Sequence, residues 1–353
     1  GIVDAFAKDS LTCFGPTAQE AQLEGSKTLS KDFMRRYNIP TAAHETFSDA
    51  ATAKAYVRAQ GAPIVIKADG LAAGKGVIVA QTEEEAAGAI DDMLSGNGFS
   101  EAGHRVVIEE FLPGEDASFI CLCDRTKAIP FASSQDHKAR DDGDRGPNTG
   151  GLGAYSPAPV VTEQVHELAM KQVILPTLKG MEAEGSPYRG FLYAGLMVSP
   201  EGDIQVVEFN CRFGDPEAQP IMMRLQSDLL PLLQQAAVGD LQTDSLQFDP
   251  RIALGVVMAA GGYPGSYDSG DAISGLDKNL EDTKVFHAGT RMENDAVVTA
   301  GGRVLCVVGL GDTAAMAQVR AYERIESIGW RGRYFRKDIG YRAVARENKA
   351  THG

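Results

Sequence analysis

The sequence lacks the features that mark nucleic-acid-binding and membrane proteins. Its 353 residues include 34 basic and 48 acidic side chains, which gives a net charge of −14 without a compensating basic block. This balance argues against a nucleic-acid or anionic-membrane partner, whereas a phosphorylated substrate needs only local positive charge. Because no run of about 18 apolar residues occurs, no membrane-spanning helix is predicted.

Cysteine is also scarce, and its spacing argues against zinc. The cysteines are scattered, odd in number and without a CxxC pair: Cys13, Cys121, Cys123, Cys211 and Cys306. This usage indicates mostly structural thiols in a reducing compartment, so a cytoplasmic location is predicted.

Signatures of nucleophilic, zinc-dependent and dinucleotide-binding enzymes are missing. There is no GxSxG and no HExxH, which argues against a serine-hydrolase elbow and a zincin. Gly309–Gly311 precedes a predicted helix and partly resembles a dinucleotide fingerprint, but no acidic residue ends a second strand about 20 residues later. Among the histidines only His137 stands out, because it lies between Asp136 and Lys138 in a polar segment.

What is present indicates a folded chain of mixed α/β (α+β) class with two or three domains. Apolar content is 43% and charged content is 23%, both ordinary for globular proteins. Helices are predicted over 2–7, 26–37, 48–61 with Ser48 as cap, 82–94 with Thr82 as cap, 162–184, 227–238 and 313–327. Strands are predicted over 11–14, 63–68, 77–80, 105–111, 117–123, 191–199, 204–209, 253–260, 284–287 and 304–310.

Residues 134–157 are rich in Gly, Asp and Pro and show no apolar period. They are predicted to form a long loop. A loop of this length in a compact region is usually functional, although a plain mobile loop would have the same composition.

Residues 204–220, IQVVEFNCRFGDPEAQP, are the most informative stretch. A strand here would bring Glu208 and Asn210 to one face, because residues two apart in a strand share a face. A carboxylate and an amide oxygen suit Mg²⁺. Arg212 has the same parity and could hold a carboxylate or phosphate with its planar fork. The alternative is a half-buried strand with a solvated charged end.

Residues 65–79, VIKADGLAAGKGVIV, predict a strand, a glycine-rich loop and a second strand. The loop amides could cradle a phosphate, with Lys67 and Lys75 as point charges. The segment is not a Walker A motif, because Asp69 and Gly76 stand where that motif needs Gly and Ser or Thr. A glycine-rich hairpin with surface lysines remains the alternative.

Residues 106–116, VVIEEFLPGED, predict a strand that runs into a Pro-Gly turn. The backbone of such an edge can hydrogen-bond adenine, and a nearby acid can hold ribose hydroxyls. A solvated acidic edge is the alternative explanation.

In order, these segments resemble one family. Lys67 with the AAGKG loop, VIEEFLPGED, DHK…GPNTGGLGAYSP and VVEFNCRFGDPE are similar to the phosphoribosylamine–glycine ligases over roughly residues 25–345. GPNTGG and EFNxRFGDPE are specific to these ligases, while the other two strings indicate only the wider ATP-grasp superfamily. The resemblance implies an ATP-grasp fold and a step of purine biosynthesis. In that step ATP, glycine and 5-phosphoribosylamine give glycinamide ribonucleotide, ADP and phosphate through a glycyl phosphate.

The resemblance also implies roles for single residues. The set expected at ATP is Lys27, Lys67, Gly74, Lys75, Gly76, Glu109, Glu110, Phe111, Leu112, Glu115 and Asp116. Glu208 and Asn210 are expected to bind Mg²⁺ (or Mn²⁺), and Arg212 and Asp215 are the catalytic candidates. Arg212 would hold the glycine carboxylate or the acyl phosphate. The acceptor site is expected to include Asp136, Lys138, Asn148, Thr149 and Gly150.

The expected domains follow from the same comparison. Residues 1–24 resemble the end of an N-terminal substrate-binding α/β domain, because the chain starts inside a βαβ pattern. Residues 25–245 would form the ATP-grasp domain, with a lid over about 48–112, and residues 250–345 a β-rich C-terminal domain. A monomer or weak oligomer is expected. Two alternatives stay open: a truncated fragment that binds ATP without turnover, and a related purine-pathway carboxylate–amine ligase.

Overall fold

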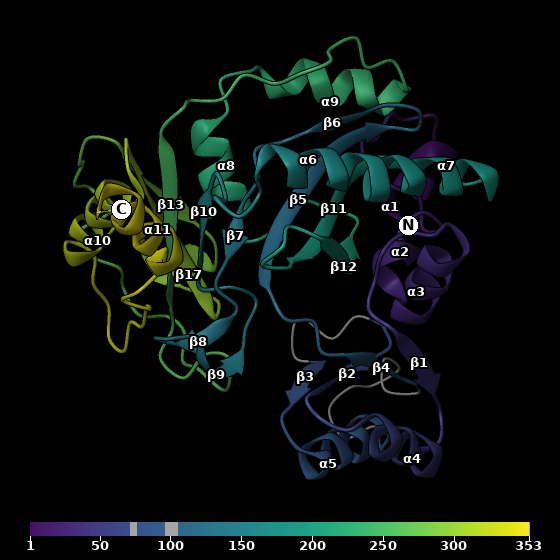
Figure 1. Ribbon diagram of the computed structural model, residues 1–353. Helices are drawn as coiled ribbons and strands as arrows, with labels where there is room; N and C mark the ends of the chain where they lie inside the picture. Colours follow the sequence, from purple (N-terminus) through teal and green to yellow (C-terminus); the bar gives the residue numbers. More distant parts are fainter. Residues whose placement is uncertain (71–75, 96–104, 353) are drawn as a thin grey trace. The chain divides into compact units, whose positions relative to one another are not determined.

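The computed structural model is mixed α/β, and its chain forms two compact units (Figure 1). Described residues are 1–70, 76–95 and 105–352. Unit 1 comprises Gly1–Phe131, Val160–Phe213 and Leu229–Ser245. Unit 2 comprises Ala132–Pro159, Gly214–Asp228 and Leu246–Gly353. Among the described helices, none is both long and apolar enough to cross a bilayer.

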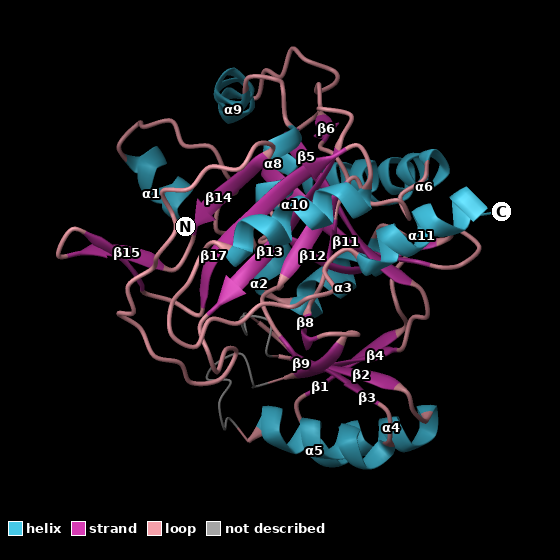
Figure 2. Cartoon of the chain, turned by 90° about the vertical axis from the view of Figure 1, so that its left-hand side faces the viewer, coloured by secondary structure: helices cyan, strands magenta, loops and turns pink. Residues whose placement is uncertain are grey.

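The first sheet of unit 1 is antiparallel, and two helices cover one of its faces (Figures 1 and 2). Its strand order is β1 (His44–Phe47), β4 (Val106–Glu110), β2 (Ile64–Ala68) and β3 (Val77–Ala80). The covering helices are α4 (Ala50–Gln60) and α5 (Glu83–Leu94). Ile64, Ile66 and Ile108 pack against them, so the alternate residues of β2 and β4 lie on the opposite face.

Side chains cap both of these helices. The Asp49 carboxylate accepts a hydrogen bond from Thr52 N at 2.9 Å, so Asp49 caps α4 and the prediction of Ser48 as the cap was wrong. The predicted Thr82 cap of α5 is confirmed, because its hydroxyl accepts from Glu85 N at 3.2 Å. Such caps satisfy a backbone N–H that has no partner inside the helix.

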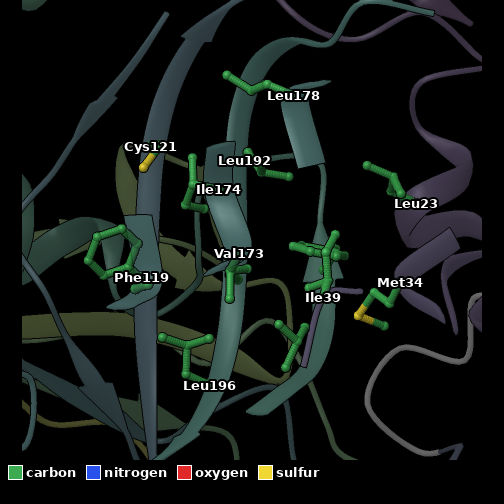
Figure 3. Packing of buried hydrophobic residues seen from close by; sticks show 14 of the residues in the cluster. Leu23, Met34, Ile39, Phe119, Cys121, Val173, Ile174, Leu178, Leu192 and Leu196 are labelled. Carbon is green, nitrogen blue, oxygen red and sulfur yellow. The ribbon is translucent and has the colours of Figure 1, made fainter. Parts of the chain in front are cut away.

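The second sheet of unit 1 carries the main core. Its antiparallel order is β12 (Ile204–Asn210), β11 (Arg189–Val198), β5 (Glu115–Asp124) and β6 (Ala128–Pro130). The helices of this part are α1 (Ile2–Lys8), α2 (Gln22–Gly25), α3 (Lys27–Arg36), α6 (Glu163–Leu168), the π-helical η2 (Ala169–Ile174), α7 (Leu175–Ala183) and α9 (Leu229–Val238). Figure 3 shows Met34 of α3, Ile174 of η2 and Leu196 of β11 in the core. Each large side chain buried in this way contributes about 1.5–3 kcal/mol.

Unit 2 is built on one five-stranded antiparallel sheet. The order is β14 (Thr283–His287), β17 (Arg303–Gly311), β13 (Ile252–Ala259), β10 (Gly153–Ser156) and β7 (Gln135–Asp136). Two small ribbons pair β8 (Ala139–Asp141) with β9 (Arg145–Asn148), and β15 (Thr290–Glu293) with β16 (Ala296–Thr299). The helices are α8 (Ala218–Arg224), α10 (Ala314–Glu326) and α11 (Tyr341–His352).

Most predicted elements are confirmed, and two are wrong. The predicted helix over 162–184 is present as α6, η2 and α7, and the predicted strand pair over 191–209 is present as β11 and β12. Residues 11–14 do not form a strand. The predicted loop over 134–157 contains the four short strands β7 to β10. Distant pairing explains this difference, because β10 is held by β13, about a hundred residues later in the chain.

Candidate active site

Unit 1 buries two lysines around one carboxylate. Glu109 on β4 is the direct partner of Val65 on β2, so these two residues share a face of the sheet. Lys67 lies two residues after Val65 and therefore lies on the same face, opposite the helices. Lys67 Nζ lies 2.9 Å from Glu109 Oε1, and Lys31 Nζ of α3 lies 2.8 Å from Oε2. All three side chains are 3–4% exposed. Lys31 Nζ also donates to Thr41 Oγ1 at 2.7 Å.

The pKa shifts of this cluster reflect burial beside mixed charges. Burial lowers the pKa of Lys31 to about 8, although Glu109 acts in the opposite direction. Burial acts to raise the pKa of Glu109, but Lys67 and Lys31 outweigh it, so that pKa is below its ordinary value. Burial is also the main reason that the pKa of Lys27 is lowered. Lys27 Nζ donates to Gly70 O at 2.9 Å.

A register shift in β12 orients the predicted metal ligands. Glu208 pairs with Gly195 while Val206 pairs with Leu196, so Val207 is the extra residue. Ile204, Val206 and Phe209 therefore all reach the core, which leaves Glu208 and Asn210 on the other face. Lys67 Nζ donates to Val207 O at 3.1 Å, and this contact ties the lysine cluster to the same strand.

Glu208 and Asn210 form an oxygen donor set that fits Mg²⁺. Glu208 is half-buried, and Asn210 is 9% exposed. Within the described part of the chain, no three His, Cys, Asp or Glu side chains gather as a metal site. Mg²⁺ often binds through only one or two protein carboxylates together with substrate phosphates and water, so the small donor set suits it.

Arg212 is held beside this donor set. Its Nη2 donates to Asn210 Oδ1 at 2.9 Å and lies 3.2 Å from Glu24 Oε1. Its Nη1 donates to Phe213 O at 3.1 Å. The side chain remains 56% exposed, so its guanidinium is accessible to an anion.

The predicted nucleotide edge and loop are described only in part. Glu110 N donates to Ala43 O at 2.9 Å, so this amide already has a protein partner, and Phe111 is 41% exposed. Glu115 and Asp116 lie on β5 opposite Val198 and Met197 of β11. Gly74 and Lys75 lie outside the described residues. Gly76 is described, and its carbonyl accepts from Ala68 N at 2.8 Å.

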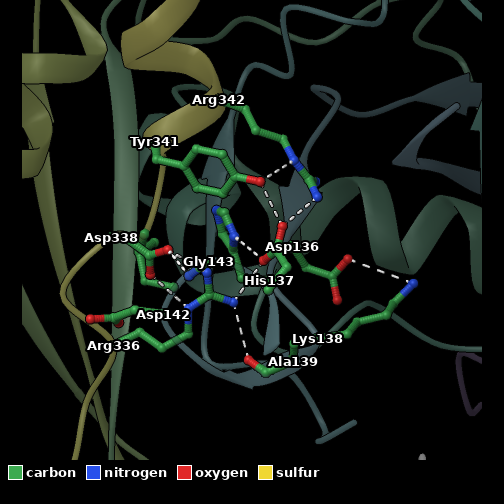
Figure 4. Close-up of polar contacts among 12 residues, drawn as sticks. Asp136, His137, Lys138, Ala139, Asp142, Gly143, Arg336, Asp338, Tyr341 and Arg342 are labelled. Atoms are coloured by element: carbon green, nitrogen blue, oxygen red, sulfur yellow. Dashed lines mark hydrogen bonds and ion pairs between the residues drawn. The ribbon is translucent and has the colours of Figure 1, made fainter. Parts of the chain in front are cut away.

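Unit 2 brings the predicted acceptor residues together. The β8–β9 ribbon pairs Ala139 with Asn148. Beside this pair, Thr149 donates to Lys138 O from its N at 2.8 Å and from its Oγ1 at 2.9 Å. Lys138 Nζ lies 3.7 Å from Asp136 Oδ1 (Figure 4). The site residues predicted from the sequence therefore fall into two sets, one in each unit.

A buried polar cluster backs the acceptor residues of unit 2 (Figure 4). His137 Nε2 accepts from Gly340 N at 2.9 Å, so the ring proton is on Nδ1, which lies 3.5 Å from Asp144 Oδ1. The fully buried Arg336 contacts Asp144 Oδ1 at 2.9 Å and both carboxylate oxygens of Asp338 at 2.8 Å. Burial is the main cause that lowers the pKa of His137.

Sequence reasoning missed Lys31, Arg336 and Arg303. Lys31 lies within a helix without any recognised motif, and its side chain meets Glu109 only in the fold. Arg303 contacts Gly150 and Asp215, which are 153 and 88 positions away. Arg336 is 192 positions from Asp144. The only local signal is the high number of arginines over 331–342, where Asp338 is the single acid.

Comparisons with known proteins show the family of the chain. The phosphoribosylglycinamide synthetase ATP-grasp (A) domain matches residues 25–218, and the C domain of that synthetase matches 253–342. Phosphoribosylamine–glycine ligases of Yersinia pestis and Escherichia coli O6:H1 are both 60% identical, over 98% of this chain and 81% of each relative.

Solved structures show the same relationship. The phosphoribosylamine–glycine ligase of Thermotoga maritima superimposes with a TM-score of 0.83 at 36% identity, over 92% of this chain and 81% of that one. A Campylobacter jejuni biotin carboxylase, at 17% identity and a TM-score of 0.73 over 94% of this chain and 73% of that one, shares the ATP-grasp fold. The chain therefore belongs to the phosphoribosylamine–glycine ligases, the ATP-grasp enzymes of purine biosynthesis that form a carbon–nitrogen bond.

Proposed function

We propose that the lysine cluster of unit 1 holds the phosphates of ATP, and the charge of this cluster is the observation that carries the assignment. Among the described residues, the carboxylates that act on Lys27, Lys31 and Lys67 are Glu109, Glu208 and Asp69. Asp69 already pairs with Arg105 at 2.6 Å, so the cations of this group exceed its carboxylates by one charge. Burying an excess of positive charge is costly unless an anion balances it. A polyphosphate would supply that anion. Glu109 then serves to hold Lys31 and Lys67 in place.

Glu208 and Asn210 would hold Mg²⁺ (or Mn²⁺), which neutralises charge on the phosphate oxygens during transfer. In the same proposal, the Glu110–Leu112 edge receives adenine, and Asp116 or Glu115 receives the ribose. Both assignments rest on the family strings and on the position of these residues in unit 1, which also contains the lysine cluster.

Arg212 would orient the glycine carboxylate for its reaction. A carboxylate oxygen attacks the γ-phosphorus, the bond to the bridging oxygen breaks, and ADP leaves, which gives glycyl phosphate. The amine of 5-phosphoribosylamine then attacks the acyl carbon, phosphate leaves with the electron pair of the broken C–O bond, and the amine loses a proton. The protein acts by positioning and by charge stabilisation, and the contacts of Arg212 with Asn210 and Glu24 suit that task.

The acceptor would bind in unit 2 at the residues gathered beside the β8–β9 ribbon. This set comprises Asp136, Lys138, Asn148, Thr149 and Gly150. Asp215, the second catalytic candidate, would act beside it, where Arg303 contacts both Gly150 and Asp215. We also propose the division into residues 1–24, 25–245 and 250–345. The protein would be cytoplasmic, and it would be a monomer or a weak oligomer. Five cysteines without disulfides support the reducing compartment.

The deciding experiment measures ADP release from ATP, with glycine, 5-phosphoribosylamine and Mg²⁺ omitted in turn. Release that needs all three supports the proposal, while release driven by another acid or amine would point to a related ligase. Glu208→Ala should lose about 100-fold or more in turnover and keep the wild-type circular dichroism spectrum. Glu201→Ala, in the exposed turn before β12, is the matched control. Full activity of Glu208→Ala would refute the metal assignment.

A further inference from the structure

We propose that Arg303 is a positioning residue of the acceptor site. It would hold the Asn148–Gly151 turn and the Gly214–Pro216 turn of unit 2 in one fixed arrangement. The proposal rests on the acceptor-site assignment made above. Arg303 lies outside the recognised motifs. Its role would explain why the GPNTGG and GDPE strings lie in contact.

The contacts of Arg303 reach both turns at once. Its Nη1 donates to Gly150 O at 2.5 Å and to Asp215 O at 3.1 Å, and its Nη2 donates to Asp215 Oδ2 at 2.7 Å. Arg303 is the first residue of β17, which pairs on both sides within the five-stranded sheet. A planar guanidinium with fixed donor directions therefore projects from a rigid base, and both turns must conform to it.

Close packing at the glycines supports this role. A Cβ at Gly150 would lie 2.9 Å from Arg303 Cζ, nearer than Cβ contacts occur. Gly151 has φ of +101°, and a Cβ there would lie 2.3 Å from Pro216 Cδ. Gly151 thus packs against the Gly214–Pro216 turn, and Gly150 packs against Arg303, with no room for a side chain at either position. These two glycines are required by the close approach of the turns and the arginine, whether or not they also contact a phosphate.

Tyr263 provides a second anchor on the same residue. Its hydroxyl accepts from Gly150 N at 3.1 Å. Its ring lies against Gly302, where a Cβ would be 2.4 Å from Tyr263 Cδ2. Gly150 is therefore held through its carbonyl by Arg303 and through its amide by Tyr263. Asn148 and Thr149, both proposed acceptor contacts, directly precede Gly150 in the chain, so fixing Gly150 also fixes their position.

The test uses the full chain and steady-state kinetics with each substrate varied in turn. Arg303→Lys keeps the charge but cannot reach both turns, so the KM for 5-phosphoribosylamine should rise about tenfold, the effect of losing a charged hydrogen bond. The KM values for ATP and glycine should stay within about twofold. Tyr263→Phe should raise the same KM less, because it removes one neutral hydrogen bond.

Arg291→Lys is the matched control, because Arg291 makes an exposed ion pair with Glu293 on β15. It should change no KM. If Arg303→Lys lowers the thermal midpoint and kcat while all three KM values stay unchanged, Arg303 is only structural and the proposal is wrong. An unchanged enzyme would also refute it.

Direct variants separate this proposal from the acceptor assignment. Lys138→Ala and Asn148→Ala should raise the KM for 5-phosphoribosylamine if the acceptor binds where proposed. If they do so and Arg303→Lys does not, only the role of Arg303 is refuted. If neither direct variant affects that KM, the acceptor assignment itself is wrong, and with it the reason for positioning these turns.

Discussion

The two units each bury a cluster of charged side chains, but they balance its charge differently. In unit 1, Lys31 and Lys67 share the single carboxylate of Glu109, and Lys27 lies close by. In unit 2, Arg336 and Arg342 meet the carboxylates of Asp144 and Asp338, two against two (Figure 4).

The pKa shifts express the same contrast. In unit 2, the contact from His137 and bonds from Tyr341 and Arg336 hold the pKa of Asp144 well below its ordinary value, although burial acts the other way. Both oxygens of the Asp144 carboxylate accept hydrogen bonds from groups of the protein, Arg336 at Oδ1 and Tyr341 and Arg342 at Oδ2. In unit 1, burial instead lowers the pKa of Lys31 to about 8, because the attraction of Glu109 and Glu208 does not outweigh burial and the nearby charge of Lys67. A balanced cluster fixes the fold, while an unbalanced one is suited to an anionic ligand.

The largest expected effect comes from breaking the balanced cluster. Arg336→Met removes a fully buried cation and leaves the half-buried carboxylates of Asp338 and Asp144 without their main partner, so stability should fall by about 3–5 kcal/mol. Trp330 is the single tryptophan of the chain and packs against the core of unit 2. Its fluorescence during urea unfolding therefore measures the loss there. Arg291→Met, at an exposed ion pair, is the control, and equal midpoints for the two variants would contradict a locking role.

A smaller effect is expected from changing the balance in unit 1. Glu109→Gln leaves Lys31 and Lys67 without their carboxylate and should cost about 2–3 kcal/mol of stability. Adding Lys31→Met removes one of the two buried charges, so the double variant should be more stable than Glu109→Gln alone. Urea unfolding followed by circular dichroism measures both. Strictly additive losses would show that charge balance does not govern this cluster.

The sequence predicted the elements whose information is local. The repeating patterns of β12 and of the helix over 162–184 gave their positions, and the spacing of Glu208 and Asn210 gave their common face. Even there the register shift at Val207 was not predictable, because it depends on pairing with β11. The strands over 134–157 were missed because their composition resembles a loop and because β10, which also pairs with β7, is held by the distant strand β13.

The missed residues of the site have the same physical origin. Lys31, Arg303 and Arg336 act through contacts made across the fold, with partners 78 to 192 positions away in the chain. A sequence motif contains residues that are close in the chain, whereas an ion pair forms between charged groups that the fold brings together. The ligands could therefore be predicted by resemblance, but the residues that hold them in place required the structure.

The smallest expected effect is the pH dependence of stability that Lys31 contributes in the unit 1 cluster. The pKa of Lys31 falls from 10.5 to about 8 on folding. Between these values the unfolded chain binds more protons, so the contribution of Lys31 to the free energy of unfolding rises with pH. Below about pH 8 both states are protonated, and the group adds no slope. Wild-type protein should therefore gain stability relative to Lys31→Met between about pH 8 and pH 10. Urea unfolding of both proteins at several pH values measures the difference, and parallel pH profiles would mean that Lys31 titrates normally and that the excess charge is already balanced within the protein.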